Sequence, residues 1–263
     1  MSLMKTLQFY FSALGLAIRA SISQRGAFLI EAFFMLANNL IFLMIWWVFF
    51  HQFKDIAGWT MRDLIALNAI GMGGYGLALV CFGGARFIGK IIISGDLDPF
   101  MTQPKNILVN LLASKSLPKG WGNILTTIIL IFIGGFTSPF SILVIAVGMV
   151  CGCLMFTSIA IIAQSTAFWL GPIDTVAKKY CDCLFLFSVY PSNIYSGMLQ
   201  VVMFTLLPAG IIGFLPVELL RDFTWTKLIV LLSSAITFFI LAFVVFFRGL
   251  KRYESGNQFG MRL

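Results

Sequence analysis

Phe28 to Phe50 reads FLIEAFFMLANNLIFLMIWWVFF, an uninterrupted stretch of 23 residues in which only one glutamate and two asparagines are polar. About 20 mostly apolar residues are enough for a helix to cross the hydrocarbon core of a bilayer. The stretch ends in an aromatic cluster, Trp46, Trp47, Phe49 and Phe50, of the kind found where a span meets the membrane interface. It therefore predicts a transmembrane helix.

The rest of the chain has the same character. Of 263 residues, 60% are hydrophobic and 11% are charged, and 28 are phenylalanine, whereas an ordinary soluble domain is about 45–50% apolar and about 25% charged. A backbone in lipid must satisfy its hydrogen bonds within its own segment, which favours helices, and no alternation typical of a barrel is present. We predict an all-α membrane protein with a single domain over residues 1–263.

Five further apolar runs give six expected transmembrane helices in all. Residues 1–25 precede the first span as an amphipathic interface helix, with Leu3, Leu7 and Leu14 on one face, and they do not resemble a removable signal peptide. The fifth run, which starts near Leu184, is interrupted by prolines. The later spans are expected at Leu64–Gly84, Trp121–Phe136, Ser141–Ala163, from Leu184 onward, and Leu228–Phe247.

The distribution of basic residues predicts the orientation. Six spans place both termini on one side, and four of the 18 lysines and arginines fall on the other side: Lys54, Arg62, Arg221 and Lys227. The remaining fourteen lie on the side of the termini: in the N-terminal segment, in the loop from Arg86 through Lys119, in a loop expected at residues 171–183, and in the tail. By the positive-inside rule, both termini, the loop at residues 85–105 and the tail at residues 248–263 are cytoplasmic.

Motifs for cofactors or catalysis are weak. Gly84–Ile91 nearly matches the phosphate-loop pattern, but Ile91 has no hydroxyl for magnesium and an apolar span precedes the motif instead of a strand. Two Cys-x-Cys pairs are better explained by packing than by a metal, because the only histidine, His51, is on the opposite side. We expect no catalysis, no metal and no cofactor in this chain, and no nucleic-acid partner.

Several polar side chains lie within predicted spans and have two open uses. Asn38, Asn39, Asn68 and Gln164 could either join helices by hydrogen bonds or line a path. Glu31 is close to the inner end of the first span, where an anchoring role competes with a functional one. The candidates for a substrate pathway are Asn38, Asn39, Asn68 and Tyr195.

Taken together, these features resemble the permease subunits of bacterial type-2 ABC (ABC-2) exporters, in the branch with six spans. The resemblance rests on the amphipathic first helix, the Ala57–Thr60 segment before the second span, and the loop sequence Ile93–Pro99 with its Gly-Asp-Leu-Asp element. Tyr190-Pro191, the Leu207 to Pro216 segment and the closing Gly249–Ser255 add to it. It covers essentially the whole chain.

The resemblance implies a half-transporter in the bacterial cytoplasmic (inner) membrane. It pairs with a second permease, identical or paralogous, and a dimer of separate cytoplasmic ATPases holds the ATP and Mg. The resemblance also implies that the loop at 85–105 holds a coupling helix between spans two and three. It implies that residues 206–222 form re-entrant outer helices between spans five and six, with Pro208 and Pro216 as an outer gate. The implied ATPase-coupling residues are Arg86, Lys90, Gly95, Asp96, Leu97 and Asp98.

Two other classes of function stay open. A secondary transporter driven by an ion gradient needs buried carboxylates near the bilayer midplane, and the sequence indicates none. A non-conducting structural membrane subunit is the third class. Exporters of this kind carry drugs, lipids, glycans or peptides, and the sequence does not choose among these cargoes.

Overall fold

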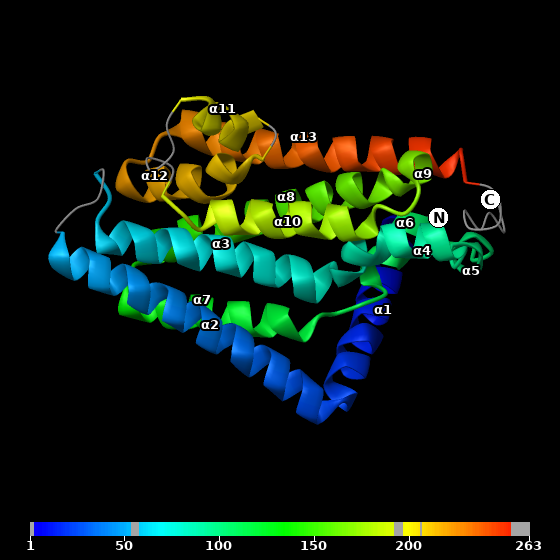
Figure 1. Ribbon diagram of the computed structural model, residues 1–263, viewed down its shortest axis with the longest axis horizontal. Helices are drawn as coiled ribbons and strands as arrows, with labels where there is room; N and C mark the ends of the chain where they lie inside the picture. The colour runs from blue at the N-terminus through cyan, green and yellow to red at the C-terminus, as the bar shows by residue number, and fades with distance from the viewer. Residues whose placement is uncertain (1–2, 54–57, 192–196, 206, 254–263) are drawn as a thin grey trace.

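The computed structural model describes residues 3–53, 58–191, 197–205 and 207–253, and it is built from helices packed side by side (Figure 1). Tyr195 and the tail beyond Tyr253 lie outside the described residues. The longer helices are α1 (Leu3–Ser23), α2 (Arg25–Gln52), α3 (Met61–Cys81), α7 (Pro118–Ile133), α8 (Pro139–Ser165), α10 (Asp174–Ser188) and α13 (Trp225–Leu250). The shorter ones are η1 (Gly83–Phe87), α4 (Ile88–Ser94), α5 (Asp98–Met101), α6 (Ile107–Ala113), α9 (Ala167–Leu170), α11 (Met198–Thr205), η3 (Gly210–Phe214) and α12 (Leu215–Arg221).

Length and hydropathy identify four helices of the described chain that could cross a membrane: α2, α3, α8 with α9, and α13. The pair α6 and α7, bent by 70° at a short break, gives a fifth candidate. The prediction of an all-helical membrane protein is therefore confirmed with four to five apolar spans. The layout with exactly six is not established by this measure, because α10 is short and carries four charged residues.

The fifth predicted helix begins earlier than expected. We placed its start near Leu184, but α10 begins at Asp174. Its first turns are polar and are supported by an i,i+4 ion pair of 2.8 Å between Lys178 Nζ and Asp174 Oδ2. A polar sequence does not prevent a helix from forming at the membrane edge, so Lys178 and Lys179 are helical residues rather than loop residues.

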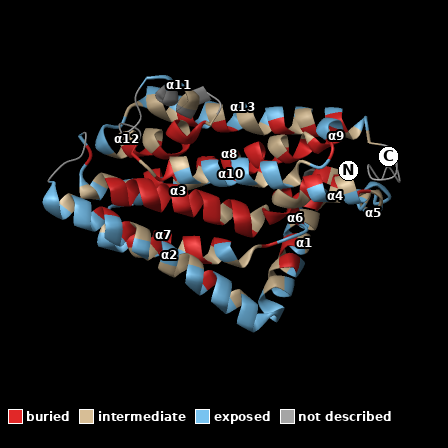
Figure 2. Cartoon of the chain, viewed as in Figure 1, coloured by how far each residue is buried: buried red, intermediate tan, exposed pale blue. Residues whose placement is uncertain are grey.

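The central helix is α3, which is buried along most of its length (Figure 2). It begins with a capping box between Thr60 and Asp63. Its glycines allow close helix contact: a side chain at Gly74 would meet the backbone of Gly152 on α8, and one at Gly76 would meet the carbonyl of Gly120 on α7. Small residues that let two helices approach closely are typical of contacts between membrane helices.

One end of the bundle gathers the start of α1, the helices α4 to α6 and the end of α13 (Figure 1). Here α1 lies across the bundle, and its Tyr10 hydroxyl donates to the Cys81 carbonyl at 2.8 Å. Leu14 and Ala17 pack inward while Leu7 and Phe11 stay exposed. We call this end the inner end and the opposite one the outer end.

The outer end carries α11, η3 and α12 (Figure 1). Pro208 and Pro216 are both buried there, but Pro216 does not stop the helix as predicted. The π-helical turn η3 precedes it directly and α12 continues from Leu215 with proline in its first turn. A wider turn and a first-turn position both tolerate the missing N–H of proline.

Candidate functional site

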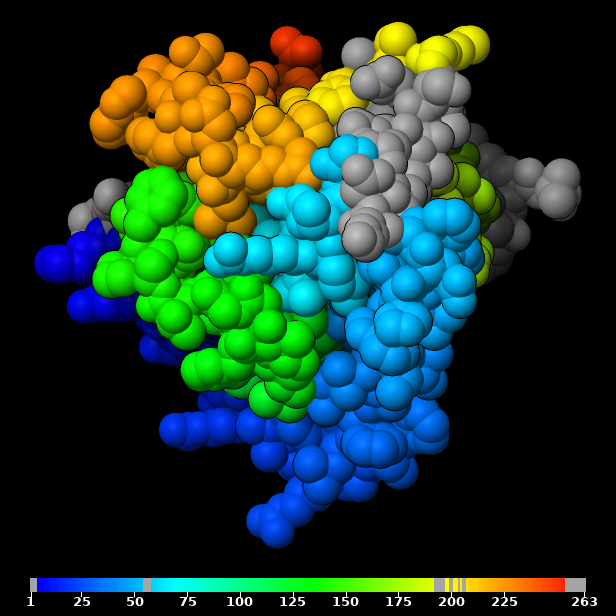
Figure 3. All heavy atoms as spheres, turned by 90° about the vertical axis from the view of Figure 1, so that its left-hand side faces the viewer, coloured from blue at the N-terminus to red at the C-terminus, as the bar shows by residue number. Residues whose placement is uncertain are grey.

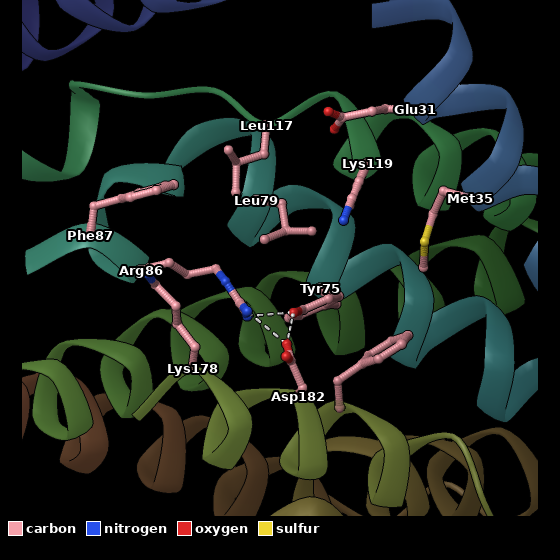
Figure 4. Close-up of a pocket in the computed structure, with 11 residues that line it drawn as sticks. Glu31, Met35, Tyr75, Leu79, Arg86, Phe87, Leu117, Lys119, Lys178 and Asp182 are labelled. Carbon is pink, nitrogen blue, oxygen red and sulfur yellow. Dashed lines mark hydrogen bonds and ion pairs between the residues drawn. The ribbon is translucent and has the colours of Figure 1, made fainter. Parts of the chain in front are cut away.

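A cavity of about 510 Å³ opens in the inner half of the bundle (Figure 4). Its wall is formed by parts of α2, α3, η1 and α10, together with the start of α7. The lining residues are Glu31 and Met35 of α2, Tyr75 and Leu79 of α3, Arg86 and Phe87 of η1, Leu117 and Lys119 at the start of α7, and Lys178, Asp182 and Phe185 of α10. This volume is in the range of small-molecule sites.

A three-residue network joins α3, η1 and α10 at the cavity (Figure 4). The Arg86 guanidinium donates to the Tyr75 hydroxyl at 2.6 Å and to the Asp182 carboxylate at 2.7 Å. The Tyr75 hydroxyl in turn donates to Asp182 Oδ1 at 3.3 Å. The Tyr75 ring stacks on Phe185 with centroids 4.3 Å apart. This network ties the segment that leads into α4 to the side of α10.

Lysines surround Phe87 beside the cavity. Lys115 Nζ lies 3.9 Å and Lys178 Nζ lies 5.3 Å from the centroid of its ring, within the range of cation–π contact. Desolvation, and next the ammonium groups of Lys90 and Lys178, lowers the pKa of Lys115. The inner mouth of the cavity is therefore crowded with positive charge.

One stripe of α2 faces the cavity. Glu31 and Met35 line it, and Asn38 follows on the same helix face because residues three, four and seven apart share a face. Further along, Phe42 meets Tyr190 at the end of α10 with ring centroids 5.3 Å apart. Asn38 is exposed. Asn38 is not among the residues that line the cavity, and its place in a pathway stays a prediction.

Two of the other asparagines lie away from it. Asn39 is buried and its amide donates to Asn123 Oδ1 at 2.8 Å and to Thr126 Oγ1 at 3.0 Å, which joins α2 to α7. Asn68 is also buried, and its amide donates to the Leu64 carbonyl of its own helix at 2.9 Å. For both residues the structure favours internal packing over the lining of a path.

The loop between α3 and α6 forms a compact unit at the inner end. Gly95 ends α4 in the left-handed conformation, with φ of 76°, as its position in the sequence suggested. Leu97 is fully buried in an apolar cluster with residues of α6, α9 and α13, so it anchors the loop rather than facing outward. Lys90 and Asp96 are exposed.

Two further residues of the loop are engaged inside the chain. The Tyr253 hydroxyl lies 3.0 Å from Asp98 Oδ1 and 3.2 Å from the Gly95 carbonyl, and donates to them. Arg86 points into the cavity network described above. Of the residues expected to contact an ATPase, Lys90 and Asp96 are those whose side chains are exposed on the loop.

A family comparison agrees with this architecture. The model of the ABC-2 family transporter protein matches residues 35–257, which is most of the chain. The chain belongs to the ABC-2 transporter family. No curated protein and no solved structure gives a match.

As an ABC-2 permease the chain is a membrane component of a transporter, and the near-match to a phosphate loop has a packing explanation. The Gly89 amide donates to Gln164 Oε1 at 3.1 Å, and a side chain at this glycine would collide with that oxygen. Gly84 is similarly pressed against the Leu111 carbonyl. The glycines of this motif bring η1 and α4 onto α8 and α6.

The cysteines of the permease also pack. All five are free thiols; Cys151, Cys153 and Cys181 are buried, Cys81 is half-buried and Cys183 is exposed. Cys151 and Cys153 belong to an apolar cluster shared by α3, α8 and α10. Their placement agrees with the packing interpretation.

Sequence reasoning missed the two residues that most define the cavity of this permease. Neither Tyr75 of α3 nor Asp182 of α10 is among the residues that the sequence predicted for a pathway. A signal was present: Asp174, Lys178 and Asp182 recur every four residues, which is the spacing of one helix face. The structure therefore supplies a carboxylate within a helix bundle where the sequence had suggested none.

Proposed function

We propose that the chain is the transmembrane subunit of an ATP-driven ABC exporter in a bacterial inner membrane, with its inner end in the cytoplasm. In this proposal α10 is a short fifth crossing, so that α2, α3, α7, α8, α10 and α13 make six spans. The 15 residues of α10 compare with the 16 of α7. Six crossings also account for α1 and the end of α13 sharing one end of the bundle.

The observation that carries the proposal is the family match together with the loop of α4 and α5 at the inner end. ATP and Mg would be held by a separate ATPase dimer. The apolar residues Ile88, Ile92 and Leu97 fix the loop to the bundle, while Lys90 and Asp96 face outward. A rigid, charged projection next to the Arg86 network suits the transmission of a partner's movement to α3 and α10.

A second permease, identical or paralogous, completes the proposed pathway. The exposed amide of Asn38 lies midway along α2 and forms no hydrogen bond with any other described residue. A polar amide facing lipid is unfavourable. We therefore place the stripe of Glu31, Met35 and Asn38 toward a shared pathway that continues the cavity. Pro208 and Pro216 belong to the segment that we propose closes its outer end.

Charge reversal at Asp96 tests the docking. Asp96 is exposed, and its contact within the loop is the Ser94 hydroxyl at 2.6 Å. With the ATPase that co-purifies with the wild-type chain, Asp96→Lys should weaken co-purification by at least about tenfold, because reversing a charge at an interface disrupts its electrostatic complementarity. Transport into everted vesicles should fall with it.

The matched control is Asp222→Lys, which makes the same charge change on an exposed carboxylate at the outer end. It should leave ATPase association unchanged. If Asp96→Lys bound the ATPase and transported as the wild type does, the docking assignment would be wrong.

The ion-gradient alternative gains one observation. Asp182 is a carboxylate within α10 that contacts Arg86 and Tyr75 at the cavity, and such groups occur in proton relays. A transport assay in vesicles distinguishes the ATP-driven exporter from the ion-gradient transporter. The exporter is supported if transport requires ATP and the ATPase subunit and persists when an uncoupler is added. Transport driven by a pH gradient without ATP supports the alternative.

A further inference from the structure

The cavity has a charge pattern that the proposed function does not explain. Lys119 lines the cavity and Lys115 lies beside it over the ring of the lining residue Phe87, and no carboxylate of the described residues lies within ion-pair distance of either ammonium group. The Lys119 side chain projects into the cavity from the start of α7 (Figure 4). Unpaired ammonium groups that converge on a cavity attract an anion.

The acidic groups of the cavity do not offset this charge. Asp182 already accepts hydrogen bonds from Arg86 and Tyr75, and Asp174, outside the lining, is bound by Lys178. Glu31 of α2 forms no ion pair with any described residue, and Figure 4 shows it beside Lys119. Lys119 in the lining and Lys115 beside it, over the ring of Phe87, therefore remain as two unpaired cations against one unpaired carboxylate.

The start of α7 adds to the positive field. Leu117 and Lys119 of the lining are the N-cap and the second residue of this 16-residue helix, and no side chain caps it. The amide groups and the dipole of a helix N-terminus favour a negative charge nearby. The helix start thus acts in the same direction as the lysines.

The opposite part of the lining is apolar. Met35 of α2, Leu79 of α3, Leu117, and Phe185 of α10 form a surface that continues from the lysines into the bundle. A site with a cationic mouth and an apolar interior matches a molecule that has an anionic head and an apolar body.

The lysines do not need to lie beside the cavity in order to orient the chain in the membrane. The positive-inside rule asks for basic residues at the inner end, and Arg248, Lys251 and Arg252 provide them from the end of α13 without approaching the cavity. The position of Lys115 and Lys119 beside the cavity therefore needs a separate cause.

We propose that this cavity binds amphipathic molecules with a phosphate or carboxylate head group, which Lys115 and Lys119 hold at the mouth while the apolar part packs against Met35, Leu79 and Phe185. The inference rests on the proposed function, since it names the cargo class of the same cavity. The head group enters from the cytoplasmic side, either on a soluble amphipath or on a lipid of the inner leaflet.

Native mass spectrometry of the purified chain in neutral detergent tests the site without an ATPase. Four probes separate the contributions: oleyl phosphate, dioleoyl phosphatidate, uncharged oleyl alcohol and inorganic phosphate. Oleyl phosphate should bind at least about tenfold more tightly than the alcohol, because each charge-assisted contact is stronger than a neutral one, and inorganic phosphate alone should not bind. Equal binding of phosphatidate indicates a bilayer lipid as ligand, and its exclusion indicates a soluble single-chain amphipath.

Matched variants tie the binding to the cavity. Lys115→Gln with Lys119→Gln should reduce the affinity for oleyl phosphate to that for oleyl alcohol, whereas Lys119→Arg, which keeps the charge, should retain it. Lys251→Gln with Arg252→Gln removes the same charge from the same end and should leave binding unchanged.

The proposal is overturned if oleyl alcohol binds as tightly as oleyl phosphate, or if the cavity variant binds like the wild type. It is also overturned if the control pair loses as much affinity as the cavity pair. Binding by a chain whose complex does not transport with ATP would refute the proposed function and leave this site standing.

Discussion

Tyr253 is the residue that attaches the end of α13 to the inner loop. Its hydroxyl donates to the Asp98 carboxylate at 3.0 Å. Burial, followed by the hydrogen bond and the negative charge of Asp98, raises the pKa of Tyr253 to about 12. The contact depends on the protonated phenol, since a phenolate would face a carboxylate without a hydrogen between them.

The first prediction concerns the titration of this contact. The pKa of Tyr253 is higher in the folded chain than the ordinary tyrosine value of about 10. Its contribution to stability is thus fully present below about pH 10 and is lost as the pH rises toward about 12. The difference in phenolate absorbance between the wild type and Tyr253→Phe should appear near pH 12, and Asp98→Asn should move it toward pH 10. A difference that titrates near pH 10 in the wild type would contradict the contact.

The second prediction concerns the amide pair that joins α2 to α7. Asn39→Leu leaves Asn123 without its 2.8 Å partner in a buried contact, and hydrogen bonds between membrane helices contribute about 0.6 to 1.7 kcal/mol. We expect a loss of about 1 kcal/mol for Asn39→Leu or Asn123→Leu alone, measured by thermal unfolding in detergent. The double variant should lose less than the sum of the two, because it leaves no orphaned amide. Strict additivity would show that the pair does not interact.

At the scale of elements, Arg221 fastens α12 to the start of α3. It contacts both carboxylate oxygens of Asp63, at 3.0 and 2.8 Å, and donates to the Gly58 carbonyl at 3.1 Å. Its guanidinium also lies 4.7 Å from the ring centroid of Trp59, which is fully buried and packs at a tilt of 47° against Phe214. The outer segment is thereby fixed to the connection between α2 and α3.

The third prediction follows from this planar contact. A lysine cannot form the paired hydrogen bonds or stack on the ring as an arginine does. Arg221→Lys should therefore destabilise the outer segment by about 1–2 kcal/mol, seen as faster hydrogen exchange in residues 207–221. Lys227→Gln is the control: its ion pairs are 3.6 Å long, and it should change exchange by less than about 0.5 kcal/mol. Equal effects of the two changes would refute the special role of Arg221.

The elements also show which features are predictable from sequence. Apolar runs in the sequence predicted α2, α3, α8 and α13, and the glycine at position 95 coincides with the end of α4. Both features can be recognised from a short stretch of sequence, because a span needs a long apolar run and a left-handed turn favours glycine. The beginning of α10 has no such signal in hydropathy, since Asp174, Lys178 and Asp182 make it polar. The use of Asn39 was undecidable in advance, because it depends on Asn123 of a helix 84 residues away.

At the scale of the whole molecule, the long helices α2 and α13 are both poorly covered by the other described helices. α2 buries only Ala32, Asn39, Leu43 and Trp46 along 28 residues. Figure 3, which looks onto the outer end, shows α2 (blue) at one edge of this face. The exposed surface of α13 is different: its polar hydroxyl at Ser233 donates to the Val230 carbonyl of its own helix, whereas the exposed Asn38 amide has no such local partner among the described residues.

The fourth prediction is that α2, and not α13, meets the second permease. In a background with Cys183→Ser, which removes the exposed thiol, Asn38→Cys should form a cross-linked dimer with a short thiol reagent in native membranes. Ile236→Cys, on the exposed face of α13, is the matched control and should stay monomeric. A helix whose midpoint carries an unpaired amide is unfavourable in lipid, whereas an apolar face is not. If Ile236→Cys formed the cross-link and Asn38→Cys did not, the prediction would be wrong. The exposed face of α2 would then face lipid, and the cavity would not open into a pathway shared by two permeases.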